Sequence, residues 1–221
     1  MDDATFGTRN QRGHWLPNRR AHYAPLFERP IEPVAIVKWL FGFPGYLLPW
    51  NTLYAGVAIA AWFLATPSTA TMRDFGVVWI AALLVRNLLV TLAWYGLFHV
   101  RLYVQRKQGT RFKYNAKWPG NSDRFTFGNQ TKDNMFWTLA SGVPIWTAYE
   151  VVAMWLFVNG HIPWLSWSGN PVWFVGFMLV IPLYRELHFY LGHRLIHWPP
   201  LYKRVHSLHH RNTNPGPWSG M

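Results

Sequence analysis

Apolar and basic blocks alternate along the chain. Five stretches contain no Asp, Glu, Lys or Arg, and they cover residues 50–66, 75–85, 88–100, 135–149 and 151–184. A helix needs about 20 mainly apolar residues to cross a bilayer, so this pattern predicts four membrane-spanning helices. We place them at approximately 46–65, 76–98, 135–158 and 171–190. The fourth stretch is apolar only to about Tyr184, so this helix either spans tilted or continues as a polar helix beyond the lipid.

The basic residues lie on one side of these predicted spans. Six Lys or Arg precede the first span, eight follow the second and four follow the fourth. By contrast, the connections 67–74 and 160–170 together contain a single basic residue, Arg73. The positive-inside rule therefore predicts that both termini and the loop between the second and third spans are cytoplasmic. The predicted fold class is all-α and integral to the membrane, with two transmembrane hairpins and a cytoplasmic histidine-rich helical region.

This pattern also predicts how the chain is divided. A basic cytoplasmic arm comes first, and a basic and aromatic cytoplasmic loop separates the two hairpins. The predicted parts are the arm at 1–45, the first hairpin at 46–98, the loop at 99–134 and the second hairpin at 135–190.

The net charge of +12 indicates an anionic partner. Such a charge is typical of nucleic-acid binding, but here the basic residues flank apolar spans. We therefore expect anionic lipid headgroups of the bilayer, and no nucleic acid, as their partner. The chain has no cysteine, which excludes disulfides and thiolate ligands. Its polar N-terminus lacks the early apolar region of a cleavable signal peptide.

Six of the ten histidines fall between residues 188 and 210. His193 and His197 form an H-x3-H pair, and His206, His209 and His210 form an H-x2-H-H group. Residues three or four apart share one face of a helix, so each group can direct its imidazoles at a common point. Imidazole suits iron, copper, nickel and zinc. The spacing therefore predicts a transition-metal site formed by these five histidines.

The sequence of this region resembles that of the fatty acid hydroxylase/sterol desaturase superfamily of membrane diiron enzymes, and of bacterial sterol desaturases in particular. The resemblance is carried by HRLIH, by HSLHH nine residues later, and by the run Leu201-Tyr202-Lys203 between them. It implies that residues 172–221 begin a catalytic domain of the fatty acid hydroxylase type. It also implies two non-haem iron ions, dioxygen as co-substrate, a lipid substrate and a separate redox partner that supplies electrons.

Two further residues are candidates for the site. Glu186 falls where the superfamily usually has an acidic residue, and it could orient a ligating imidazole or simply pair with Arg185. His188 lies five residues before His193, so it points roughly 140° away around the helix. It is therefore a candidate for an additional ligand or for a group that supports one.

Superfamily members carry a further histidine box downstream, and this chain stops at Met221. We therefore expect an N-terminal fragment that lacks the last ligands needed for activity. The leading prediction is an oxidoreductase that hydroxylates or desaturates a sterol or fatty acyl lipid. The alternatives are a histidine-based metal-binding or transport protein of the membrane, an inactive truncated family member, and a zinc hydrolase. The last is disfavoured because no H-E-x-x-H motif occurs.

Two charged residues fall inside the predicted spans. Arg86 lies about 11 residues from the outer end of the second span and Glu150 about 8 residues from the outer end of the third. With a rise of about 1.5 Å per residue, they sit at similar depth. Because an isolated charge in lipid is costly, we predict that they form a structural ion pair.

Overall fold

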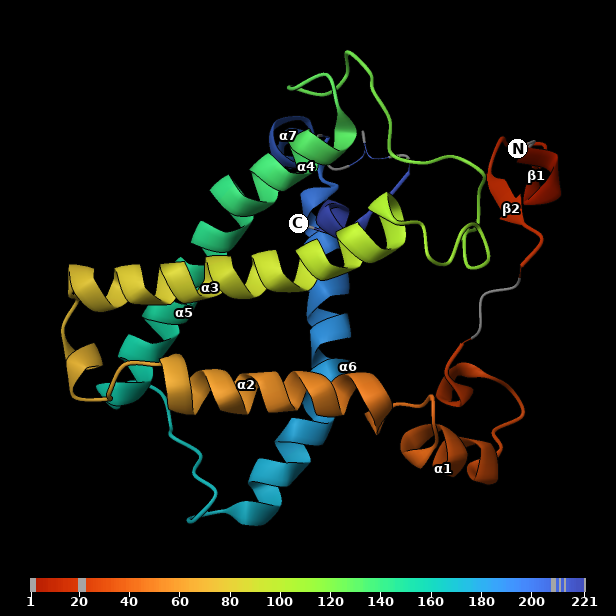
Figure 1. Cartoon of the computed structure of the whole chain (residues 1–221). Coiled ribbons are helices and arrows are strands. Elements are labelled where there is room, and N and C mark those ends of the chain that lie inside the picture. The colour runs from red at the N-terminus through yellow and green to blue at the C-terminus, as the bar shows by residue number, and fades with distance from the viewer. Residues whose placement is uncertain (1–2, 20–22, 208–209, 211, 213, 221) are drawn as a thin grey trace. The chain divides into compact units, whose positions relative to one another are not determined.

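The computed structural model describes the chain except residues 1–2, 20–22, 208–209, 211, 213 and 221. It is mostly helical, with one small sheet near the N-terminus (Figure 1). The helices are α1 (Pro33–Phe41), α2 (Thr52–Ala65), α3 (Val77–Phe98), α4 (Gln130–Trp137), α5 (Val143–Val158), α6 (Pro171–Ile196) and α7 (Pro199–Leu201), and the strands are β1 (Gly7–Arg9) and β2 (Trp15–Pro17). Short 3₁₀ or π-helical segments include Leu47–Asn51, His99–Val104, Thr138–Gly142, Tyr202–His206 and Pro217–Gly220.

Four helical stretches are long and apolar enough to cross a membrane, as the sequence predicts. They are Leu47–Ala65, Val77–Val104, Gln130–Val158 and Pro171–Ile196. The chain is therefore a multi-pass membrane protein by helix length and composition, while the orientation stays a prediction.

The third and fourth stretches extend beyond the predicted spans, at the start of the third and at the end of the fourth. The third begins at Gln130 because the side chain of Asn129 accepts a hydrogen bond from the amide of Lys132 at 3.0 Å, which caps the helix. The fourth stays helical through its polar last turns to Ile196. The helix therefore continues past the apolar stretch, while its tilt in the membrane stays a prediction.

The chain forms two compact units. The first consists of Met1–Thr66 and Thr110–Lys117, and the second of Pro67–Gly109 and Trp118–Met221. The small sheet belongs to the first unit, where β1 pairs antiparallel with β2 and the indole Nε1 of Trp15 donates to the carbonyl of Tyr114 at 2.8 Å. The predicted hairpin of the first two spans stays a prediction, because α2 and α3 belong to different units.

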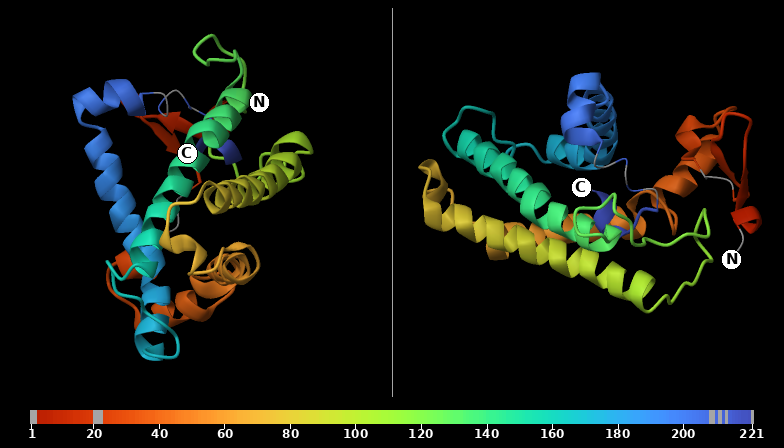
Figure 2. Two further views of the ribbon diagram at one scale, coloured as in Figure 1. Left: turned by 90° about the vertical axis from the view of Figure 1, so that its left-hand side faces the viewer. Right: turned by 90° about the horizontal axis from the view of Figure 1, so that it is seen from above.

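The second unit is built on the pairing of α3 with α5, which lie side by side in Figures 1 and 2. Met72, Trp79, Leu83 and Val151 form its buried apolar core. The indole of Trp79 also donates to the carbonyl of Asp74 at 3.0 Å, which closes the turn into α3. This small core is the packing that holds the second and third spans together.

Arg86 and Glu150 meet across the α3–α5 interface, which confirms the predicted ion pair. A guanidinium nitrogen of Arg86 donates to Glu150 Oε1. Asn87 donates from Nδ2 to Glu150 Oε2 at 2.9 Å and to Thr147 Oγ1 at 3.0 Å. Thr147 in turn donates to the carbonyl of Val143 at 2.8 Å. Both carboxylate oxygens of Glu150 are therefore satisfied within the helix pair.

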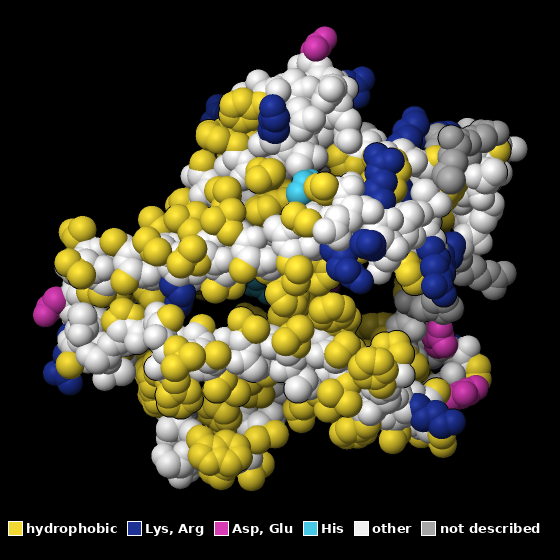
Figure 3. Space-filling view, viewed as in Figure 1, with side chains coloured by type: hydrophobic (Ala, Val, Ile, Leu, Met, Phe, Trp, Pro, Cys, Tyr) yellow, Lys and Arg dark blue, Asp and Glu magenta, His cyan; other side chains and the backbone are white. Residues whose placement is uncertain are grey.

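The surfaces of the helices are mostly apolar. Figure 3 shows hydrophobic side chains over the visible faces of α2 and α3, while Lys and Arg gather over the polar segments. No residue of α2 or of α6 is buried. A large apolar surface is unfavourable in water, whereas the same surface is favourable in contact with lipid. The exposed apolar faces therefore agree with spans that contact lipid.

Candidate metal centre

The first two histidines of the predicted site lie in the last turn of α6. His193 is inside this helix, and His197 is its C-terminal cap with a backbone still in the helical region. The next residue, Trp198, is extended at φ −60° and ψ 131°. It precedes Pro199, and proline disfavours a helical conformation in the residue before it. The helix therefore ends directly after the H-x3-H pair.

The chain then reverses and brings the second histidine group back to the first. Pro199 and Pro200 start α7, where the missing amide hydrogen of proline costs nothing. A single π-helical turn, Tyr202–His206, follows and packs against α6. The chain therefore reverses direction at Pro199-Pro200, and this reversal places the second histidine group next to the first.

Four imidazoles converge at this reversal. The Nε2 atoms of His193 and His197 lie 3.1 Å apart. The ring centroid of His206 lies 4.6 Å from that of His193, 4.7 Å from that of His197 and 4.6 Å from that of His210. One ring nitrogen from each of the four lies within 4.8 Å of the others. The histidines from both sequence groups thus form one cluster.

This spacing fits a transition-metal ion. An imidazole nitrogen binds such an ion at about 2.1 Å, so two ligands of one ion lie about 3 to 4 Å apart. The 3.1 Å between His193 and His197 falls in that range, and all four nitrogens lie within 4.8 Å of one another. The four nitrogens can therefore surround one ion after a small inward movement. An all-imidazole set suits iron, copper, nickel or zinc.

The four rings of the cluster differ in burial, and the pKa of one of them, His197, is shifted. His206 is buried, at 4% exposure, whereas His197 and His210 are exposed. The pKa of His197 is lowered from its ordinary value by desolvation and by its neighbours His193 and His210. A neutral ring keeps a lone pair on one nitrogen, which a metal ligand requires.

Three other predicted site residues are not part of this cluster. His209 lies outside the described residues, and His188 and Glu186 lie apart from the four imidazoles. His188 stacks on Tyr184, with ring centroids 6.1 Å apart. Glu186 accepts a hydrogen bond from Arg185 at 2.6 Å, and both side chains are exposed. Their roles as an extra ligand or a supporting group stay predictions.

One aromatic residue at the centre was not singled out as a site residue from the sequence. The ring of Tyr202 lies 5.8 Å from that of His197, 6.1 Å from that of His206 and 5.5 Å from that of His210. Tyr202 precedes His206 by four residues, so helical spacing could have indicated that the two share a face. The phenol therefore forms one wall of the cluster.

Comparisons with known proteins agree with part of the predicted resemblance. Over 61 residues, the chain is 38% identical to fatty acid hydroxylase domain-containing protein 2 of Macaca fascicularis and 36% identical to the protein of the same name of Homo sapiens. Each match covers 24% of this chain and spans only 18% of the relative. No family model and no solved structure matches. The chain therefore has a partial and distant similarity to fatty acid hydroxylase domain-containing protein 2, at superfamily level.

Proposed function

We propose that this chain supplies part of the metal centre of a membrane-bound non-haem iron oxygenase that hydroxylates or desaturates a lipid. The observation that carries the proposal is the convergence of four imidazoles at the end of a helix long and apolar enough to cross a membrane. The similarity to a protein whose name includes a fatty acid hydroxylase domain supports a lipid substrate and its hydroxylation. Iron is the proposed metal because it is one of the ions that an all-imidazole set suits.

In this proposal His193, His197, His206 and His210 hold the metal, and His209 is the fifth ligand. When bound, iron supplies the dioxygen chemistry that oxidises an unactivated C–H bond, which amino-acid side chains cannot perform alone. In this role the residues of the chain hold the ion at the end of α6. Four imidazoles suffice for one ion, so the second iron needs ligands beyond the described cluster.

The surface of α6 favours a lipid as the substrate. The ring of Phe189 is more than half exposed and lies 5.3 Å from the ring of His193, so an apolar face of α6 reaches the cluster. An acyl chain or sterol ring that lies along this face would stay out of water and still reach the histidines. The structure therefore supports lateral entry from the bilayer in preference to capture from solution.

A histidine-based metal transporter is the alternative from another functional class. Transporters place their ion site near the middle of the membrane, along discontinuous helices. Here the cluster lies past the last apolar turn of α6, and α6 continues unbroken through its internal Pro182. This position favours chemistry at the membrane surface over passage through it.

Metal content is the direct test of the proposal. The chain is purified in detergent and its metals are measured by elemental analysis, with iron expected at roughly one ion per chain, because the four described imidazoles suffice for one ion. His206→Ala removes the buried ligand and is expected to abolish iron binding. His161→Ala is the matched control, because the ring of His161 lies against that of Trp155 outside the cluster and its loss should leave the iron in place.

Lipid analysis tests the reaction itself. Lipids from cells that express the full-length gene product are compared with lipids from cells that express its His206→Ala variant. The expected product carries one added oxygen atom or lacks two hydrogen atoms, and it forms only in the presence of dioxygen. A chain that purifies with zinc and no iron would contradict the oxygenase assignment and favour another use of the cluster.

A further inference from the structure

A row of buried polar side chains lies at the start of the third candidate span. Gln130, Asn134 and Thr138 are spaced four residues apart, so they share one face of the helical stretch Gln130–Val158. Their exposures are 2%, 8% and 0%. A buried polar side chain is costly unless a partner satisfies it. This face must therefore be matched by polar groups from another part of the chain.

The partner is the segment Asn214–Ser219, which we call the docking segment. It ends in a 3₁₀ turn, Pro217–Gly220, which packs against α4 and α3. Each of the three polar side chains donates one hydrogen bond to it. The bonds run from Gln130 Nε2 to the Asn214 carbonyl at 2.9 Å, from Asn134 Nδ2 to Ser219 Oγ at 2.8 Å, and from Thr138 Oγ1 to the Trp218 carbonyl at 3.0 Å.

The second span holds the other side of the docking segment. The hydroxyl of Tyr103 donates to the carbonyl of Pro215 at 2.9 Å. The ring of Tyr95 meets that of Trp218 edge to face, with centroids 5.5 Å apart. At Gly216 an added Cβ would lie 3.4 Å from the Tyr103 ring, which is van der Waals contact, so the main chain of the segment runs close to this ring.

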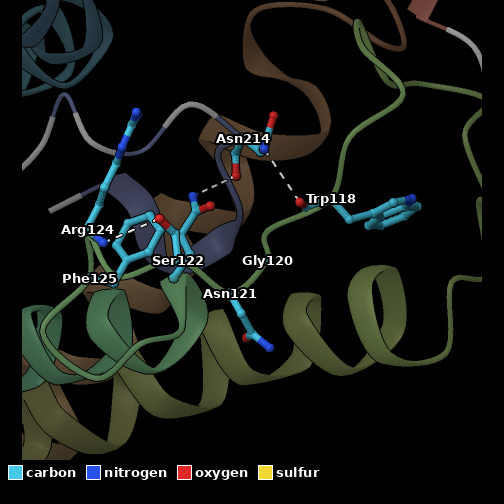
Figure 4. Close-up of a pocket in the computed structure, with 8 residues that line it drawn as sticks. Trp118, Gly120, Asn121, Ser122, Arg124, Phe125 and Asn214 are labelled. Carbon is cyan, nitrogen blue, oxygen red and sulfur yellow. Dashed lines mark hydrogen bonds between the residues drawn. The ribbon is translucent and has the colours of Figure 1, made fainter.

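Figure 4 shows the beginning of the docking segment. Asn214 faces Trp118, with its Nδ2 3.5 Å from the Trp118 carbonyl. A pocket of about 140 Å³ lies beside it, bordered by Ser122 and Phe125. The segment is therefore held at its beginning, by loop residues and Gln130, and at its end, by Asn134 and Thr138.

We infer that Asn134 and Thr138 are positioning residues for the metal centre. The docking segment begins four residues after His210, so docking restrains the histidine-bearing turn from its C-terminal side. The turn Tyr202–His206 and α7, packed on α6, restrain it from the other side. Two fixed ends hold His206 and His210 near His193 and His197 before a metal binds. This inference rests on the proposed metal site.

The physical cause is the entropy of an ordered segment. If the docking segment is free, metal binding must itself order the turn that carries His206 and His210, which weakens the affinity. Thr138→Val keeps the shape of the side chain and removes its donor, so the buried Trp218 carbonyl loses its partner. A lost partner of this kind is expected to weaken metal binding about tenfold if docking and binding are coupled.

The test is a Co(II) titration of the full chain in detergent, followed by the absorption of the bound ion. Thr138→Val is expected to raise the dissociation constant about tenfold, and Thr138→Ser to restore it, because serine keeps the hydroxyl. Thr147→Val is the matched control. Thr147 is an equally buried threonine of the same helical stretch, but its bonds go to Asn87 and Val143.

The outcomes separate this inference from the proposed function. If the wild-type chain binds no Co(II), both are wrong. If the wild-type chain binds Co(II) and Thr138→Val binds it equally well, the positioning role alone is wrong. A similar loss in Thr138→Val and Thr147→Val would show a general loss of stability and would also overturn the positioning role.

A second measurement uses the absence of cysteine from the chain. Ser219→Cys introduces a single buried thiol in the docking segment, and its labelling rate by a maleimide reports undocking. Coupling between two sites is reciprocal, so Co(II) is expected to slow the labelling. In the His206→Ala background Co(II) should have no effect. Labelling that ignores Co(II) with the histidines intact would overturn the inference.

Discussion

Arg86 on α3 donates a hydrogen bond to Glu150 on α5, inside the stretches where both helices are candidate membrane spans. Asn87 adds bonds to the second oxygen of Glu150 and to Thr147. Each of the two charges therefore has a partner, as expected inside a membrane, where an isolated charge is costly. The same contacts join the second and third spans, so the pair is a part of the packing of α3 on α5.

We predict that neutralising one partner is worse than neutralising both. Arg86→Met leaves the carboxylate of Glu150 without its cation and is expected to lower the free energy of unfolding by about 3–5 kcal/mol. Arg86→Met combined with Glu150→Gln should recover much of this loss. The measurement is the unfolding midpoint in detergent for the two single variants, the double variant and the charge-swapped Arg86→Glu with Glu150→Arg. Additive losses in the double variant would contradict a pair.

The fold could be predicted from the sequence as far as hydrophobicity alone decides it. Helix length and the absence of charge predict the four spans, and the matching depth of Arg86 and Glu150 predicts their contact. The packing of Leu83 and Val151 into a core could not be predicted. In a span, residues that face lipid and residues that face another helix are both apolar. The β1–β2 hairpin was missed because three-residue strands are too short to show alternation.

Part of the candidate site could also be predicted from the sequence. The two histidine groups were evident from their spacing, and the structure brings His206 and His210 to the pair on α6. The role of Thr138 was not evident, because its partner, the Trp218 carbonyl, is a main-chain group 80 residues away. A main-chain acceptor leaves no trace in residue types. Polar residues four apart, from Gln130 to Thr138, were the available signal. The sequence pattern instead divides them, with Gln130 and Asn134 in the polar loop and Thr138 in the third span.

We predict that His197 and His188 differ in their effect on metal binding. His197→Ala removes a member of the cluster and is expected to lower metal affinity at least about 100-fold. His188→Ala should leave the affinity unchanged, because this ring stacks on Tyr184 outside the cluster. Isothermal titration of the purified variants with Co(II) measures both. A large loss in His188→Ala would instead support the role as an additional ligand.

Cysteine labelling can test the orientation predicted from the basic residues. The chain contains no cysteine, so Ser68→Cys and Gln108→Cys each introduce a single thiol. Ser68 lies in a connection with almost no basic residue, whereas Gln108 lies in the basic loop, and both are exposed. A membrane-impermeant maleimide is expected to label the first in intact cells and the second only after lysis. The reverse pattern would place the histidines on the other side of the membrane.

Metal binding should stabilise the histidine-bearing turn against unfolding. An ion held by His193 and His197 on α6 and by His206 in the following turn adds a further connection between elements that already pack against each other. Binding to the folded chain alone raises its stability by about 2.7 kcal/mol when the free metal is at 100 times its dissociation constant. Thermal unfolding in detergent is therefore expected to shift upward with Co(II) and to shift back with a chelator. The shift should be absent in His206→Ala and retained in His161→Ala, and an equal shift in both variants would mean that the metal acts elsewhere.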